Sequence, residues 1–162
     1  MKKYKWILIL LNLAILLVLF NRSIFQKEAL LENGQLVLFE LAPVDPRSLM
    51  QGDYMRLNYA ISNNIDTDSI AKRGFCVIKL TENGIAKKVR MQDGKEPINE
   101  GEFLIRYNLK KWGRLSIGAE SYFFQEGDAK KYEKAKYGGI KVDTQGNSLL
   151  VGLYDESRQK IE

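Results

Sequence analysis

The feature that most constrains this chain is a continuous apolar segment close to its N-terminus. From Trp6 to Phe20 the sequence reads WILILLNLAILLVLF, with Asn12 as its one polar residue. A helix over this run is about 22 Å long, and flanking Lys and Arg side chains can reach across the rest of a hydrocarbon core about 30 Å thick. The run therefore predicts a single N-terminal transmembrane helix. Residues 1–33 are expected to form this anchor and a short stalk that ends at Gly34.

The charges beside the apolar run predict its orientation. Four basic residues border it: Lys2, Lys3, Lys5 and Arg22. Three of them precede the run, and no acidic residue occurs before Glu28. Because cationic flanks stay on the cytoplasmic side, the N-terminus is expected inside the cytoplasmic membrane and residues 34–162 outside it. A cleaved signal peptide has a similar start, but no small-x-small cleavage site follows Phe20, so the anchor is expected to remain uncleaved.

Composition excludes several classes of function for the part of the chain that follows the anchor. Without the four flanking cations, 21 of the 25 basic residues remain against 20 acidic ones, so this part is nearly neutral and no nucleic-acid partner is expected. Cys76 is the single cysteine and cannot form an intramolecular disulfide; its apolar neighbours predict a buried strand position. The chain has no histidine, which excludes a Ser-His-Asp hydrolase and a His-ligated metal centre. We expect no cofactor and no metal.

Beyond Gly34 the sequence changes to short apolar runs separated by turn residues. Nine of these runs predict β-strands: Gln35–Val44, Asp53–Ile61, Phe75–Thr81, Ile85–Met91, Glu102–Leu109, Arg114–Ile117, Glu120–Phe124, Ile140–Asp143 and Ser148–Tyr154. Asn83-Gly84 predicts a tight hairpin in which both residues adopt positive φ. The predicted fold is mostly β, with an antiparallel sheet that is curled or barrel-like. One short amphipathic helix, AKKYEKAKYG, is expected after an Asp128 N-cap and would cover the sheet.

The densest cluster of special residues is APVDPRSLMQGDYMRLNY. Asp45 and Pro46 are typical of an N-cap and a first helical position, and Gly52 is typical of a left-handed helix stop. A single helical turn is therefore expected to link two strands. Arg47 could join Asp45 and Asp53 through charge-assisted hydrogen bonds, which would hold the turn against the strand.

The strand that follows this turn alternates in character. One set of side chains is expected to pack into the core: Met55, Leu57 and Tyr59. The other set is expected to face outward: Tyr54, Arg56 and Asn58. Because Tyr and Arg are frequent anchors of protein interfaces, we expect Tyr54 and Arg56 to bind a partner.

The octapeptide GDYMRLNY resembles the pattern for which the GDYxxLxY family of bacterial membrane-anchored proteins is named. The matching positions are Gly52, Asp53, Tyr54, Leu57 and Tyr59. The segments PVDPRSLMQ, SYFFQEGDAKKYEKAKYG and VDTQGNSLLVGL are also similar to that family. The resemblance implies an extracytoplasmic domain that acts with a multi-spanning membrane protein, and a role in regulating an amylopullulanase has been suggested for the family.

Two enzymatic alternatives remain open from the residues alone. Ser48 and the glycine-aspartate after it are faintly similar to the serine region of type I signal peptidases, which pair a serine with a desolvated lysine. Lys79, within the apolar run FCVIKLT, is expected to be the half-buried lysine that such a site needs. Alternatively, Asp45 and Asp53 could act as paired carboxylates on a glycan. We favour a non-enzymatic binding or accessory module that contacts a membrane or envelope protein.

Overall fold

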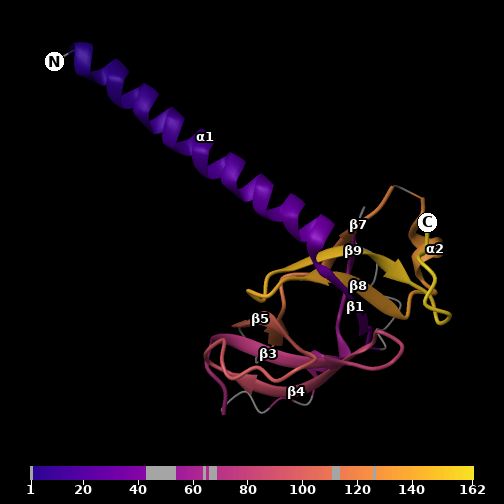
Figure 1. Ribbon diagram of the computed structural model, residues 1–162. Helices are drawn as coiled ribbons and strands as arrows, with labels where there is room; N and C mark the ends of the chain where they lie inside the picture. Colours follow the sequence, from indigo (N-terminus) through magenta and orange to yellow (C-terminus); the bar gives the residue numbers. More distant parts are fainter. Residues whose placement is uncertain (1, 43–53, 64, 66–68, 111–113, 126) are drawn as a thin grey trace.

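The computed structural model describes residues 2–42, 54–63, 65, 69–110, 114–125 and 127–162, and for residues 2, 3 and 54 it describes the backbone alone. The chain is mostly β, with antiparallel sheets that follow one long N-terminal helix (Figure 1). The predicted fold class is confirmed.

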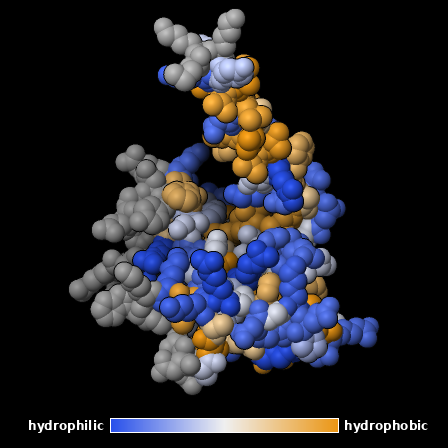
Figure 2. All heavy atoms as spheres, turned by 90° about the vertical axis from the view of Figure 1, so that its left-hand side faces the viewer, coloured by the Kyte–Doolittle hydropathy of each residue, from blue (hydrophilic) through white to orange (hydrophobic). Residues whose placement is uncertain are grey.

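Helix α1 (Lys2–Asn33) is continuous from the apolar run through the expected stalk. It is long and apolar enough to cross a membrane, and no residue of its most apolar stretch is buried in the rest of the chain. Figure 2 shows its hydrophobic surface rising from a more hydrophilic domain. Near its end Leu30 is buried against the domain, and the Gly34 amide donates a hydrogen bond to the Leu30 carbonyl at 2.9 Å.

Two antiparallel sheets form most of the domain. The first has the order β1-β8-β9 and consists of β1 (Gln35–Glu40), β8 (Tyr137–Val142) and β9 (Ser148–Tyr154). The second has the order β4-β3-β5-β6 and consists of β3 (Arg73–Leu80), β4 (Ala86–Gln92), β5 (Glu102–Lys110) and β6 (Arg114–Ser116). An isolated parallel bridge between Leu38 and Ile85 connects them. The first sheet lies next to the end of α1, whose last turns contact β8 and β9 (Figure 1).

A third, two-stranded sheet contains the motif strand. It consists of β2 (Tyr54–Arg56) and β7 (Ser121–Phe123), which pair antiparallel. Strand β2 is shorter than predicted, because the chain leaves the ladder after Leu57 and then forms a short 3-10 helix, η2 (Ala60–Ser62). Each of the nine predicted segments nevertheless contains a strand.

The predicted helix after Asp128 is present but shorter than expected. Helix α2 spans only Ala129–Tyr132, and the end of the predicted helix is instead the start of β8. Asp128 stands at the N-cap position of α2 as predicted, but with φ −82° and ψ 0° it makes no side-chain cap hydrogen bond. Strand β8 pairs with β1 on one side and β9 on the other. These ladders on both sides outweigh the helix propensity of the Ala, Lys and Glu residues.

The predicted hairpin at Asn83-Gly84 is present with a different turn geometry. Gly84 has a φ of +75°, whereas Asn83 does not adopt positive φ. The loop from Thr81 to Ile85 is longer than a two-residue turn, and it is closed by hydrogen bonds from the Ile85 amide to Thr81 Oγ1 and from the Thr81 amide to the Ile85 carbonyl. A longer loop needs a left-handed conformation only at its glycine.

One core fills the space between the sheets. It contains Val37 and Phe39 of β1, Ile140 of β8, Ile105 of β5 and the predicted strand cysteine, Cys76 of β3. Burial raises the pKa of the Cys76 thiol to about 11, so this cysteine is unreactive at neutral pH. The C-terminal segment was not predicted to pack: it turns back after β9 and buries Ile161, whose amide donates to the Leu153 carbonyl.

An ion pair crosses the second sheet between β4 and β5. Arg90 binds the Glu102 carboxylate through two parallel hydrogen bonds of 2.7 and 2.8 Å. Asn99 also donates to this carboxylate, from its amide and its side chain. The hydrogen bonds from Arg90 and Asn99 lower the pKa of Glu102 to about 2.

This ion pair predicts a pH-dependent contribution to stability. Because the pKa of Glu102 is depressed in the folded state, its contribution is fully present above the usual carboxyl value of about 4.5 and is lost as pH falls toward about 2. The Glu102→Gln variant should therefore melt below wild type at neutral pH, and the two melting temperatures should converge on acidification. Thermal melting of the full chain in detergent, followed by near-ultraviolet circular dichroism, measures this. A difference between the two melting temperatures that stays constant from about pH 4.5 to about pH 2 would contradict the stabilising role of the Glu102 carboxylate.

Candidate functional site: a groove beside the motif strand

The described part of the motif begins at Tyr54. The residues predicted to form the capped turn lie outside the described residues, so their proposed roles stay predictions; they are Asp45, Pro46, Arg47, Gly52 and Asp53, together with Ser48. The backbone of Tyr54 lies opposite Phe123 in the ladder, and that of Arg56 lies opposite Ser121. The Leu57 amide extends this pairing by donating to the Glu120 carbonyl at 2.8 Å.

The predicted alternation of the motif strand is present from Met55 to Tyr59, whereas the side chain of Tyr54 lies outside the described residues and its outward position stays a prediction. Three of its residues are buried in the core: Met55, Leu57 and Tyr59. Arg56 and Asn58, between them, are exposed. The motif strand therefore contributes to the core on one side and offers polar groups to solvent on the other.

Tyr59, the last residue of the motif, connects three parts of the domain. Its hydroxyl donates a 2.5 Å hydrogen bond to the Ala119 carbonyl. Its ring meets Phe39 of β1 edge-on, with 5.9 Å between centroids. It also packs on Gly138 of β8, where an added Cβ would lie 2.9 Å from a carbon of the Tyr59 ring. Burial, and to a smaller extent the charge of Glu120, raises the pKa of the Tyr59 phenol, so it stays protonated and donates this bond.

The turn that presents the Ala119 carbonyl is held by the carboxylate of Glu120. One carboxylate oxygen accepts hydrogen bonds from the amides of Ile117 and Gly118, and the other accepts from the Ser116 hydroxyl. Gly118 adopts a φ of +84°, which a side chain would strain. Glu120 is therefore engaged in forming the turn that Tyr59 needs.

A groove of about 390 Å³ opens beside the motif strand. It lies beside the last pair of the β1–β8 ladder, between the motif strand and the segment after α2. Its lining residues are Glu40, Leu41, Ala42, Met55, Arg56, Leu57, Asn58, Tyr132, Glu133, Ala135, Lys136, Tyr137 and Glu156. Backbone hydrogen bonds fix its walls: the Leu41 amide donates to the Lys136 carbonyl, and the Ala42 amide donates to the Asn58 carbonyl, both at 2.8 Å.

The groove has an apolar floor and a charged rim. Met55, Leu57 and Tyr132 are buried, whereas Arg56 and Lys136 are exposed at the rim with carboxylates nearby in the lining. Within the part of the chain that the structure describes, the Arg90–Glu102 ion pair is the only one, so none of these rim charges is neutralised by another described residue. Such unpaired charges around an apolar surface suit contact with another macromolecule.

An aromatic cluster supports the wall that α2 contributes. The Tyr132 ring meets Tyr122 of β7 edge-on, with 5.1 Å between centroids, and lies 5.5 Å from Phe124. Burial, followed by a hydrogen bond with Tyr132, raises the pKa of Tyr122 to about 12. The Tyr122 phenol therefore stays protonated at neutral pH, and the aromatic cluster joins the groove wall to the strand that pairs with the motif.

A larger cavity, of about 660 Å³, lies between the last turns of α1, the β4–β5 loop and the β8–β9 hairpin. No motif residue lines it, whereas Met55, Arg56, Leu57 and Asn58 all line the groove. We therefore take the groove as the candidate site.

The structure removes one support of the serine-lysine alternative. Lys79 lies in β3 as expected, but its side chain is exposed rather than half buried, so the prediction of a buried lysine is wrong. Side chains alternate along a strand, and Lys79 points away from the core that Ile78 enters. A catalytic lysine of that kind needs desolvation, which this position does not give. Among the described residues, no group of three or more Asp, Glu and Cys side chains could hold a metal ion.

Sequence reasoning located the motif strand but missed most of the groove. Glu40, Lys136 and Glu156 belong to β1, to the segment after α2 and to the C-terminal turn-back, which lie far apart in sequence. The one local signal was the Tyr137-Gly138-Gly139 run, since paired glycines in a strand mark a close approach by another group. Here that group is Tyr59 over Gly138.

Comparison with known proteins agrees with the motif. The sequence pattern of the GDYXXLXY protein family matches residues 16–153, which cover most of the chain. No curated protein and no solved structure matches the chain. Because this match covers most of the chain, the chain belongs to the GDYXXLXY protein family.

Proposed function

We propose that this protein is an extracytoplasmic binding module, anchored by α1 in the cytoplasmic membrane with its N-terminus inside, which acts through contact with a membrane or envelope protein. The observation that carries the proposal is the groove beside the motif strand. There the alternation of the strand commits Met55, Leu57 and Tyr59 to the core and leaves Arg56 exposed at the rim.

The anchor is supported by α1. Its apolar residues are exposed on all sides from Trp6 to Phe20, which in water would be costly and in a bilayer is favourable. The three lysines before the run supply the charge asymmetry for an inside N-terminus. Helix α1 continues without a break to Asn33 at the first sheet. The domain would therefore sit close to the outer face of the cytoplasmic membrane.

The composition of the groove favours a polypeptide as its ligand. Its rim carries charges of both signs. The positive charges come from Arg56 and Lys136, and the negative charges come from Glu40, Glu133 and Glu156. A phosphate or nucleic-acid site would concentrate cations. Mixed charges around buried Met55 and Leu57 fit a segment that offers an apolar side chain between polar ones.

We expect replacement of Tyr54 and Arg56 together by alanine to weaken partner capture by about 30-fold, the effect of losing an interface hot spot. The experiment is crosslinking in intact cells from the full-length chain, with mass spectrometry of the captured proteins. Arg73→Ala is the matched control, because Arg73 is an exposed arginine of β3 that does not line the groove. Melting temperatures of both variants should stay at the wild-type value.

Two outcomes would contradict the proposal. Undiminished capture by the double variant would remove the motif strand from the interface. A hydrolytic activity abolished by Ser48→Ala or Asp53→Asn without loss of folding would replace the binding module by an enzyme.

A further inference from the structure

Asn12 is the polar residue in the middle of the apolar run of α1. Its side chain is exposed, and no hydrogen bond joins it to any other residue that the structure describes. A primary amide has two N–H donors and a carbonyl acceptor. In the hydrocarbon core of a membrane no water satisfies them, and unsatisfied polar groups there are costly.

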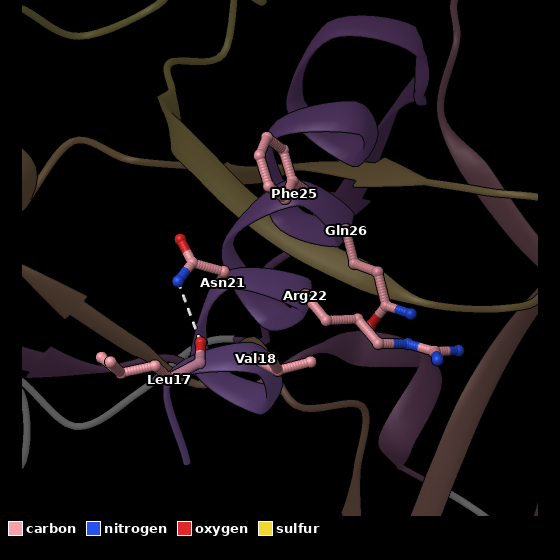
Figure 3. A pocket seen from close by; sticks show the side chains of 6 residues that line it. All are labelled: Leu17, Val18, Asn21, Arg22, Phe25 and Gln26. Atoms are coloured by element: carbon pink, nitrogen blue, oxygen red, sulfur yellow. Dashed lines mark hydrogen bonds between the residues drawn. The ribbon is translucent and has the colours of Figure 1, made fainter. Parts of the chain in front are cut away.

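The second asparagine of α1 pairs one of its donors locally and has polar neighbours. Asn21 lies at the end of the apolar run, and its side-chain amide donates to the Leu17 carbonyl one turn earlier at 2.9 Å (Figure 3). Arg22 and Gln26 line the same shallow groove on the helix surface, so Asn21 has polar neighbours at the expected edge of the membrane. Asn12 has apolar residues on every side, from Leu8 to Leu16.

A local bond alone would not satisfy Asn12. If it turned back onto the Leu8 carbonyl, as Asn21 does onto Leu17, one donor would be paired. The amide carbonyl oxygen of Asn12 would still lack a donor, because the backbone N–H groups inside a helix already bond within it. A complete set of partners has to come from outside α1.

We infer that α1 pairs within the membrane with α1 of a second copy of this chain, through reciprocal hydrogen bonds between the two Asn12 amides. The inference rests on the proposed membrane anchoring. Around a two-fold axis parallel to the helices, each Asn12 amide donates to the carbonyl oxygen of the other at the same depth. A helix of another protein would need its own polar group at that depth, whereas the second copy supplies it by symmetry.

The surface around Asn12 suits such a pairing. Five apolar residues share its face one and two turns away: Leu8, Ile9, Ile15, Leu16 and Leu19. This spacing is that of a two-helix seam, in which a single asparagine fixes register and the number of helices. No charged residue interrupts the face between Trp6 and Phe20, and the domain does not cover it.

The test is a cysteine scan of α1 in membranes of cells that express the full-length chain. Native Cys76 is buried and gives no background. Leu8→Cys and Ile15→Cys lie about 40° and 60° from Asn12 around the helix, whereas Leu10→Cys and Leu17→Cys lie about 160° and 140° away. Under mild oxidation we expect disulfide-linked dimers from the first pair and few from the second.

The amide itself is tested by Asn12→Leu in the Leu8→Cys background, which should lower the dimer yield by about tenfold. Asn12→Gln keeps the amide and should keep the dimer. Asn21→Leu is the matched control, since Asn21 lies beside Arg22 and Gln26 at the expected edge of the membrane, and it should change nothing.

Equal crosslinking at all four positions, an undiminished dimer with Asn12→Leu, or crosslinks only to a different protein would each overturn the inference. Alkaline extraction of the same membranes reports the anchor separately. A chain that is extracted fails the proposed anchoring, whereas a chain that stays in the membrane without Asn12-dependent dimers fails only this inference.

Discussion

Replacing Tyr59 with alanine should lower the free energy of unfolding by about 3–5 kcal/mol, the usual loss for removing a buried aromatic side chain. Tyr59 is almost completely buried and joins Phe39, Gly138 and the carbonyl of Ala119. Its removal would leave a cavity where β1, β8 and the turn before β7 meet. Because whole domains are stable by only about 5–15 kcal/mol, much of the population should unfold near growth temperature.

Smaller changes at the same place separate the contributions to this effect. Tyr59→Phe keeps the ring but leaves the buried Ala119 carbonyl without its donor, which should cost about 1–3 kcal/mol. Asn58→Ala, at the exposed neighbouring position, should change stability by less than about 0.5 kcal/mol. Thermal melting of the full chain in detergent compares the three variants. A Tyr59→Ala variant that melts like wild type but no longer captures a partner would make this motif residue a contact and not a core element.

The strands were predictable because their signals are local. Alternation along the motif separates Met55 and Leu57 from Arg56, and the structure buries the first two while exposing the third. The turn residues between two of the runs located a hairpin, where Gly84 adopts the positive φ that a turn glycine allows. The alternation of side chains along a strand and the residue preferences of turns depend only on neighbours in sequence. Both can therefore be recognised without knowledge of the fold.

The errors share one physical cause, which is that long-range contacts decided the outcome. Tyr137 has helix-forming residues before it, yet it opens a strand because β1 and β9 offer partners on both sides. Lys79 lies in an apolar run, but the sheet turns its side chain outward. Ile161 is buried because the C-terminal segment turns back onto β9, and a short polar segment gives no sequence signal for such a turn.

The candidate site was predictable only in its centre. Arg56 was expected on the outward face because its neighbours in the strand alternate. The opposite rim, with Lys136 and Glu156, depends on how α2 and the C-terminal segment pack. No spacing in the sequence relates these residues to the motif strand, so the groove appears only in three dimensions.

The second large expected effect concerns topology. A cysteine at Lys87, an exposed position on β4, should react completely with a membrane-impermeant maleimide added to intact spheroplasts, because the domain is proposed to lie outside. A cysteine inserted after Met1 should react only after lysis. Native Cys76 should stay unmodified in both cases, since it is buried and its pKa is raised to about 11. In intact spheroplasts we therefore expect complete labelling of the cysteine at position 87 and no labelling of the cysteine after Met1.

This labelling experiment tests the central claim most directly, since a contact with an envelope partner requires the domain to be outside. Membranes washed at alkaline pH should retain the protein, and the Lys87→Cys chain should shift fully on a gel before lysis while the N-terminal cysteine does not. Labelling of the N-terminal cysteine in intact spheroplasts, with Lys87→Cys protected until lysis, would reverse the topology and contradict the account.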